Sequence, residues 1–196
     1  MLTQKIVPFI LFFFFCSAAF SQDEKTERAA SSAKLEEHEH HSMKGSHRFT
    51  LGLGHTHVSE GQIGNKTQWL GIASWSFNYD YWLSDKWAVG LQNDILLESF
   101  KIEGHDGVEI ERDYPLAFVP VAIFKPGAHF SFIGGVGAEI AGGHSLTLTR
   151  VGVEYGWHVA RKWEVGAAAV WDIKWKYYNT WGLSFTVSRI WQKETK

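Results

Sequence analysis

From Ser46 onward, hydrophobic and polar residues alternate along the chain with a period of two, and this feature restricts the fold more than any other. Such alternation is typical of β-strands that have one apolar face, and clusters of turn-forming residues separate the alternating segments. We predict eight strands, at residues 47–58, 67–82, 87–102, 112–124, 130–141, 146–159, 163–177 and 180–191. Each is at least about as long as the roughly 9–11 residues that a tilted strand needs to cross a bilayer.

The predicted strand at 163–177 shows its two faces most clearly. Aromatic and aliphatic residues occupy the odd-numbered positions, whereas Glu164, Asp172, Lys174 and Lys176 fall on even-numbered positions. The segments 87–102, 146–159 and 180–191 divide in the same way. A soluble β-sandwich would also alternate, with its apolar face inward, so the period alone does not separate that fold from a membrane barrel.

The positions of the tryptophans favour the barrel. The chain has 10 Trp in 196 residues, whereas a two-layer core about 10 Å thick is filled mainly by smaller side chains. Several of them border strand ends, with Trp69, Trp175 and Trp181 at one end and Trp87, Trp157, Trp163 and Trp191 at the other. The sequence therefore predicts two interfacial aromatic girdles, and the mixture of tight turns with longer loops at 59–66 and 104–111 agrees with this.

The segments outside 46–191 point to export. Residues 1–21 have the form of a cleavable signal peptide, with Lys5, an apolar stretch at 6–15 and the cleavage site 19–21. The only cysteine, Cys16, lies in this leader, so we expect no disulfide. Residues 192–196 form a short C-terminal extension.

Residues 22–45 are charged and lack an apolar period, which predicts a disordered tail. His38, His40 and His41 stand among glutamates in this tail and are candidate ligands for Zn, Cu or Ni. We favour a solvated charge run without fixed ligand geometry, because the spacing matches no closed metal site. The net charge of −2 offers no basic field for nucleic acid, which we exclude as a partner.

Together these features resemble the small eight-stranded outer-membrane β-barrels of the OmpA/OmpX type, over residues 46–191. The last strand also resembles the signal recognised by the outer-membrane assembly machinery, at Thr180, Gly182, Phe185 and Val187. The resemblance implies an all-β, eight-stranded antiparallel up-and-down transmembrane barrel in a Gram-negative outer membrane. It further implies a periplasmic tail, contact with the bilayer and lipopolysaccharide, assistance by the assembly machinery during folding, and a monomeric state.

Eight strands enclose an interior just wide enough for side chains, so we expect a filled lumen and no general porin. The inward rows are predicted to carry a network of mixed charges with a structural role: Asp94, Glu98, Glu139, Arg150, Glu154, His158, Glu164, Asp172, Lys174 and Lys176.

Some barrels of this kind are enzymes that modify lipid A, such as deacylases and acyltransferases, and use His and Ser near the outer leaflet. Candidates for that role are His55, His57, Ser99, His144 and Ser145, although the simpler interpretation places them at the membrane interface. The sequence contains no GxSxG, HExxH, P-loop or dinucleotide motif. We therefore expect a structural or interaction protein without a cofactor, and keep lipid modification, metal binding by the tail, and a soluble ligand-binding barrel as alternatives.

Overall fold

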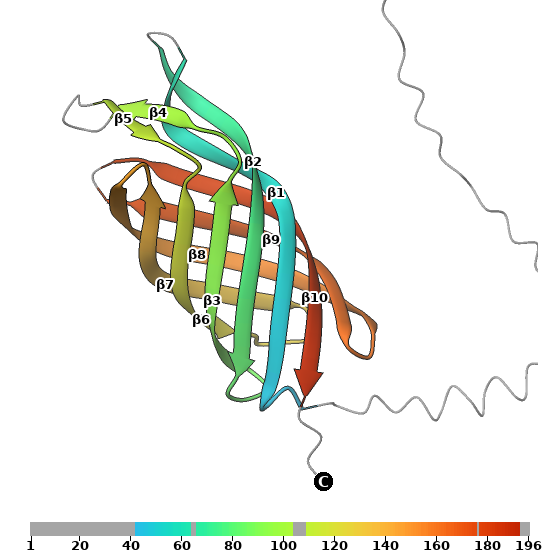
Figure 1. The fold of residues 1–196 in the computed structure, drawn as a ribbon. Helices are drawn as coiled ribbons and strands as arrows, with labels where there is room; N and C mark the ends of the chain where they lie inside the picture. Colours follow the sequence, from blue (N-terminus) through green and yellow to red (C-terminus); the bar gives the residue numbers. More distant parts are fainter. Residues whose placement is uncertain (1–41, 64–65, 104–108, 176, 193–196) are drawn as a thin grey trace, which may run out of the picture. The chain divides into compact units, whose positions relative to one another are not determined.

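The computed structural model describes residues 42–63, 66–103, 109–175 and 177–192, which form an antiparallel β-barrel (Figure 1). The eight strands of the barrel wall are β1 (Ser46–Ile63), β2 (Lys66–Trp82), β3 (Trp87–Leu96), β6 (Leu116–Phe124), β7 (Phe130–Ala141), β8 (His144–Ala160), β9 (Trp163–Lys174) and β10 (Asn179–Gln192). These strands pair with their neighbours in this order, and β1 closes the barrel by pairing with β10 from Ser46↔Gln192 to Val58↔Thr180. The predicted all-β, eight-stranded antiparallel barrel is confirmed. The described residues include no helix long and apolar enough to cross a membrane.

The two ends of the barrel differ. Short connections at 83–86, 125–129 and 161–162 lie at the same end as the first residue of β1 and the last of β10 (Figure 1). We call this the turn end, and the opposite end, which carries the β1–β2 and β3–β6 connections, the loop end. A small hairpin of β4 (Phe100–Glu103) and β5 (Glu109–Arg112) stands at the loop end, where Gly61 of β1 pairs with Ile102 of β4.

Several predicted strands were wrong in extent. The strand predicted at 47–58 extends to Ile63, and the one predicted at 163–177 ends at Lys174. The strand predicted at 87–102 ends at Leu96 and resumes as β4, and the strand predicted at 112–124 is interrupted between Arg112, the last residue of β5, and Leu116, the first of β6. Pro115 separates β5 from β6, where its carbonyl accepts a hydrogen bond from Leu96 N at 3.0 Å. Because proline has no amide hydrogen and restricts the residue before it, the regular ladder stops there and the chain turns into the hairpin.

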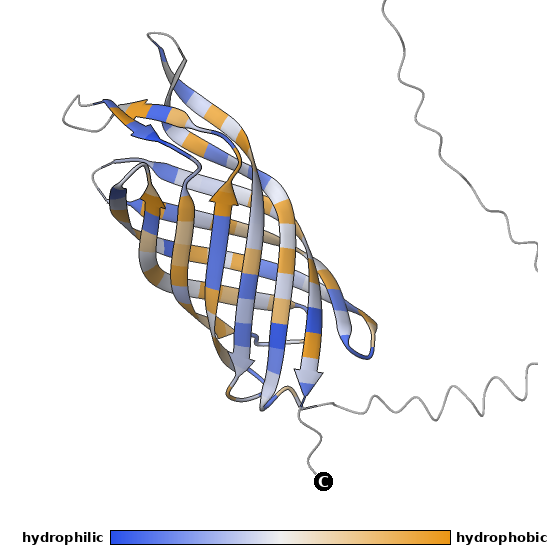
Figure 2. Cartoon of the chain, viewed as in Figure 1, coloured by the Kyte–Doolittle hydropathy of each residue, from blue (hydrophilic) through white to orange (hydrophobic). Residues whose placement is uncertain are grey.

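Polar and apolar residues alternate along several strands of the closed sheet (Figure 2), and many large apolar side chains are exposed on its outer face. Along β9, Trp163 and Trp171 are exposed, whereas Glu164, Asp172 and Lys174 are buried inside the barrel. The same alternation occurs on β2, where Trp75 is exposed and Asp80 is fully buried. An exterior of this kind is stable against hydrocarbon rather than water.

The interior also contains apolar side chains, in two clusters. One consists of Trp82, Ala88, Ala117, Val119, Val121, Ile123, Ile133 and Leu148. The other lies towards the loop end and consists of Val58, Ile72, Leu96, Phe100, Ile102, Leu146 and Tyr178. Strand β6 is consequently apolar on both faces. The charged residues of the interior come mainly from the other strands.

Candidate functional site

The polar interior is organised around three arginines, each held by carboxylates from other strands. Arg150 on β8 lies midway along the barrel and donates two hydrogen bonds of 2.7 Å to the two carboxylate oxygens of Asp172 on β9. Its Nη1 also donates to Asp94 on β3 and, at 3.3 Å, to Gln92. This bidentate contact satisfies the guanidinium and the buried Asp172 carboxylate, whereas the Asp94 side chain is 25% exposed.

Arg48 occupies the interior nearer the turn end. It contacts Asp80 and Glu154 at 2.7 Å and Glu164 at 3.1 Å, so that strands β1, β2, β8 and β9 are joined across the lumen. Lys125 contacts Glu164 at 3.5 Å. The ring of the fully buried Trp82 lies 5.9 Å from the Arg48 guanidinium and 5.7 Å from the Lys125 ammonium, within the range of cation–π attraction.

The third group lies towards the loop end around Glu139 on β7. Arg112 contacts Glu139 Oε1 at 2.8 Å, and Lys174 contacts Oε2 at 3.2 Å while donating to Thr180 at 2.7 Å. Tyr178, in the β9–β10 connection, donates to Glu139. Burial and the Glu139 carboxylate raise the pKa of the Tyr178 phenol above its ordinary value, which keeps it a neutral donor.

The structure places most of the predicted interior charges inside the barrel, with two corrections. Glu98 is exposed, because β3 ends two residues before it and the alternation is lost. The side chain of His158 is 45% exposed, although it lies 3.5 Å from Glu164. A register shift between His158 and Ala160 shows that the ladder is irregular there. Lys176 lies outside the described residues.

Sequence reasoning missed four interior charges: Arg48, Asp80, Arg112 and Lys125. Arg48 and Asp80 could have been found, because each occupies the polar phase of an alternating segment. Arg112 and Lys125 had no such signal. Arg112 belongs to the β5 hairpin strand, and Lys125 follows the last residue of β6.

The proposed catalytic histidines and serines do not converge. His55 and His57 both point outward from β1, and the His57 ring stacks on Trp181 with centroids 4.1 Å apart. Ser99 hydrogen-bonds to Asp113, and His144 and Ser145 are exposed at the start of β8. Within the described ranges, no hydrogen bond joins any of these histidines to any of these serines, and no cluster of three or more His, Cys, Asp or Glu could hold a metal ion. The candidate ligands His38, His40 and His41 lie outside those ranges.

The residues predicted to form the aromatic girdles all belong to the outward face. Six are exposed, namely Trp69, Trp87, Trp157, Trp163, Trp175 and Trp191, while Trp181 is partly covered by its stacking with His57. Trp175 Nε1 donates to Thr149 Oγ1 at 3.1 Å. Trp75 and Trp171 are also exposed, between the two ends.

An ordered surface continues beyond the aromatic residues at the loop end. β1 extends past His57 through a register shift between Val58 and Gly61, where Glu60 has a φ of 57°. β4 then adds to β1, and Phe100 and Ile102 of β4 pack with Val58 and Tyr178 in the apolar cluster described above. Strands β4 and β5 are thus packed against the barrel at this end.

Comparison with solved structures finds the same closed eight-stranded architecture in small outer-membrane β-barrels. The chain is similar to Ail of Yersinia pestis in complex with the heparin analogue sucrose octasulfate, with a TM-score of 0.54 and 13% identity over 76% of this chain and 99% of that chain. It is also similar to Neisserial surface protein A, with a TM-score of 0.50 and 10% identity over 74% of this chain and 99% of that one. No family model and no curated protein matches the sequence. The chain therefore has the fold of these small eight-stranded barrels.

Proposed function

We propose that this protein is an integral protein of a Gram-negative outer membrane, where it presents an interaction surface outside the cell. The turn end faces the periplasm and the loop end faces outward, because barrels of this class have short periplasmic turns and longer external loops. The bilayer and lipopolysaccharide surround the exposed apolar face, and the paired interior charges make the barrel a scaffold, not a pore.

The observation that carries this proposal is the sheet beyond the girdle at the loop end. A barrel that only spanned the membrane would not require strands beyond Trp181. Here β1, β4 and β5 continue past that residue around a buried apolar cluster. The hairpin presents charges of both signs, since Glu109 and Glu111 of β5 are exposed and the exposed Lys101 of β4 pairs with Glu111. Ordered strands at this position hold side chains in fixed places for a partner.

Cysteine labelling tests the location and the orientation, because the only native cysteine is Cys16 in the predicted leader. A membrane-impermeant maleimide should label Glu111→Cys on intact cells, whereas Lys86→Cys in the β2–β3 turn should react only after the outer membrane is opened. Both residues are exposed, so accessibility within the protein is matched. The opposite labelling pattern, or recovery of the protein in the soluble fraction without detergent, contradicts the proposal.

The interaction role needs a second measurement. A photo-crosslinking residue at position 111 should form crosslinks to macromolecules on intact cells. The same residue at Val136, which is 60% exposed on the lipid-facing side of β7, should crosslink to lipid. If position 111 gives no more macromolecular crosslinks than position 136, the loop end is not an interaction surface.

A further inference from the structure

Arg189 is a cation on the lipid-facing side of β10, close to the turn end. Its neighbours across the two ladders are Trp163 of β9 and Phe49 of β1. The Arg189 guanidinium carbon lies 5.2 Å from the Trp163 ring and 5.4 Å from the Trp191 ring. The two indoles orient the guanidinium, but neither supplies an anion, and a charge at a membrane-facing position usually has a functional reason.

Two further cations lie beside Arg189. Arg161 and Lys162 are exposed in the β8–β9 turn, and the Lys162 carbonyl accepts a hydrogen bond of 2.9 Å from Ile190 N, next to Arg189 in the chain. The acidic residues of β8, β9 and β10 in the described ranges are Glu154, Glu164 and Asp172, and all are buried on the inner face. The outer surface at this place therefore has only positive charge from these three strands. We call Arg161, Lys162 and Arg189 the cationic patch.

A channel of small side chains leads away from the patch along β9. Its floor consists of Val165, Ala167 and Ala169, which alternate with inward residues. Larger side chains lie on both sides, since Ala167 pairs with Tyr155 of β8 and with Phe185 of β10. Phe185 is 81% exposed, so its ring projects from the outer face beside the small side chain of Ala167. We call this channel the β9 groove.

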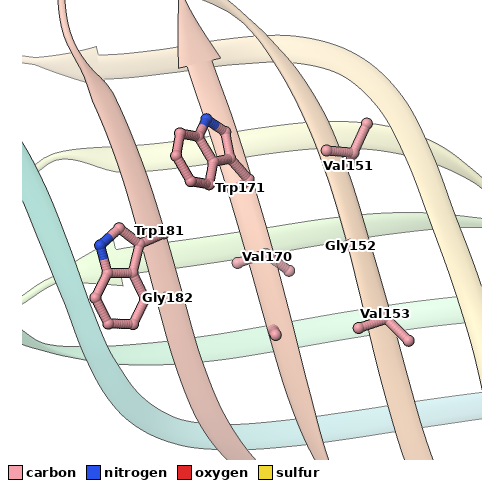
Figure 3. Close-up of a pocket in the computed structure, with 8 residues that line it drawn as sticks. Val151, Gly152, Val153, Val170, Trp171, Trp181 and Gly182 are labelled. Atoms are coloured by element: carbon pink, nitrogen blue, oxygen red, sulfur yellow. The ribbon is translucent and has the colours of Figure 1, made fainter.

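The β9 groove ends in an open recess of about 480 Å³ between Val151, Val153, Trp171 and Trp181 (Figure 3). Figure 3 shows the two indoles projecting from neighbouring strands beside the valines of β8. The lining is almost entirely apolar, in contrast to the patch at the other end of the groove.

The length of the groove matches one leaflet. The six residue-to-residue steps from Trp163 to Ala169 span roughly 20 Å along a strand at about 3.3 Å per step. A strand tilted by about 45° crosses roughly 14 Å of depth over that distance, which is about half of a hydrocarbon core roughly 30 Å thick. Ala169 then lies near the middle of the bilayer, the recess lies beyond it towards the loop end, and the cationic patch lies at the headgroup level of the leaflet on the turn side.

From this arrangement we propose that the cationic patch and the β9 groove together bind one anionic phospholipid. The phosphodiester lies against Arg189, with Arg161 and Lys162 adding charge, and one acyl chain follows the alanine floor to the recess. A planar guanidinium suits two phosphate oxygens at once, which a zwitterionic lipid with its own cation beside the phosphate satisfies less well. The inference requires the barrel to be in a membrane, but it is independent of any partner at the loop end.

Native mass spectrometry of the folded exported chain in detergent tests the headgroup. With dioleoyl phosphatidylglycerol and dioleoyl phosphatidylcholine as probes, the wild-type protein should retain one molecule of the first under conditions that remove the second. Arg189→Gln should bind phosphatidylglycerol roughly tenfold more weakly, as expected when a hydrogen-bonded charge contact of about 1.5 kcal/mol is lost. Lys86→Gln removes a cation at the same end, across β1 and β2 from the patch, and should bind as the wild type does.

The acyl chain is tested by filling the groove. Ala167→Phe should reduce phosphatidylglycerol retention, whereas Ala122→Phe, an exposed outward position on β6, should not. Heat-modifiable gel mobility shows that each variant is folded before it is measured. Equal retention of the two lipids by the wild-type protein, or unchanged retention in Arg189→Gln, overturns the proposal, and unchanged retention in Ala167→Phe overturns the assignment of the groove. Because this assay uses isolated protein, its failure leaves the labelling and crosslinking results on cells unaffected.

Discussion

At the scale of single residues, buried cations offset the repulsion between interior carboxylates that lie close together. Asp94 and Asp172 come from strands on different sides of the lumen and both contact Arg150. Without that cation, two carboxylates would share a space with little water. Removing one partner of a buried ion pair is costly because it leaves uncompensated charge, even where the intact pair contributes little net stability.

We therefore expect Arg150→Met, which roughly preserves volume, to lower the free energy of unfolding by about 3–5 kcal/mol. Lys162→Met, at an exposed turn position, should change it by less than about 0.5 kcal/mol. Urea unfolding in phospholipid vesicles, followed by heat-modifiable gel mobility, measures both. Equal stability of the two variants would show that Arg150 is not a structural centre of the interior.

At the scale of the element, the backbone of β7 approaches that of the neighbouring strand β6 closely at Gly137. A Cβ built on Gly137 would lie 2.1 Å from the Phe118 carbonyl oxygen and 2.7 Å from Val119 Cα, both backbone atoms of β6. A Cβ on Gly134 meets no atom within 4 Å. The β6–β7 ladder skips Val119 and Pro120, and the close approach occurs beside this interruption.

The two glycines form a matched pair for mutation. Gly137→Ala should destabilise the barrel by roughly 1–3 kcal/mol, because backbone atoms must move to accept the methyl group. Gly134→Ala should be nearly neutral. The same urea unfolding assay compares them, and a neutral Gly137→Ala would mean that β6 and β7 separate more easily than their register suggests.

At the scale of the whole molecule, the direction of the two faces decides the environment. Trp75 and Tyr81 are both 38% exposed on the outer face of β2, Trp75 midway along the barrel and Tyr81 close to the turn end. In a bilayer, an arginine costs about 2–4 kcal/mol at the midplane and only about 0–1 kcal/mol near an interface. Trp75→Arg should therefore be much more destabilising than Tyr81→Arg in vesicles. Equal losses for the two variants would indicate that this face does not contact hydrocarbon.

Conductance is a second property of the whole molecule. Because the arginine clusters and Trp82 occupy the lumen, the purified protein should produce no porin-like current steps in a planar bilayer. A porin of known conductance, purified and inserted in the same way, is the positive control. Regular steps that persist after repurification would contradict a filled interior.

The sequence by itself determined the strands and the orientation of their faces. Alternation with a period of two is a local property, so Trp163, Glu164, Trp171 and Asp172 could be assigned to opposite faces without any tertiary information. The eight strands followed from the same pattern, whereas their antiparallel order was implied by the resemblance to small outer-membrane barrels. Near Pro115 the alternation did not predict the break between β5 and β6.

Only the tertiary structure decided which side chains meet. Arg48 and Glu164 are separated by 116 positions, yet barrel closure brings them into contact. The curvature of the sheet also brings the Trp82 ring within 5.9 Å of the Arg48 guanidinium and 5.7 Å of the Lys125 ammonium. Such contacts depend on register across several ladders, and a single strand carries no information about the residues on strands that it does not touch.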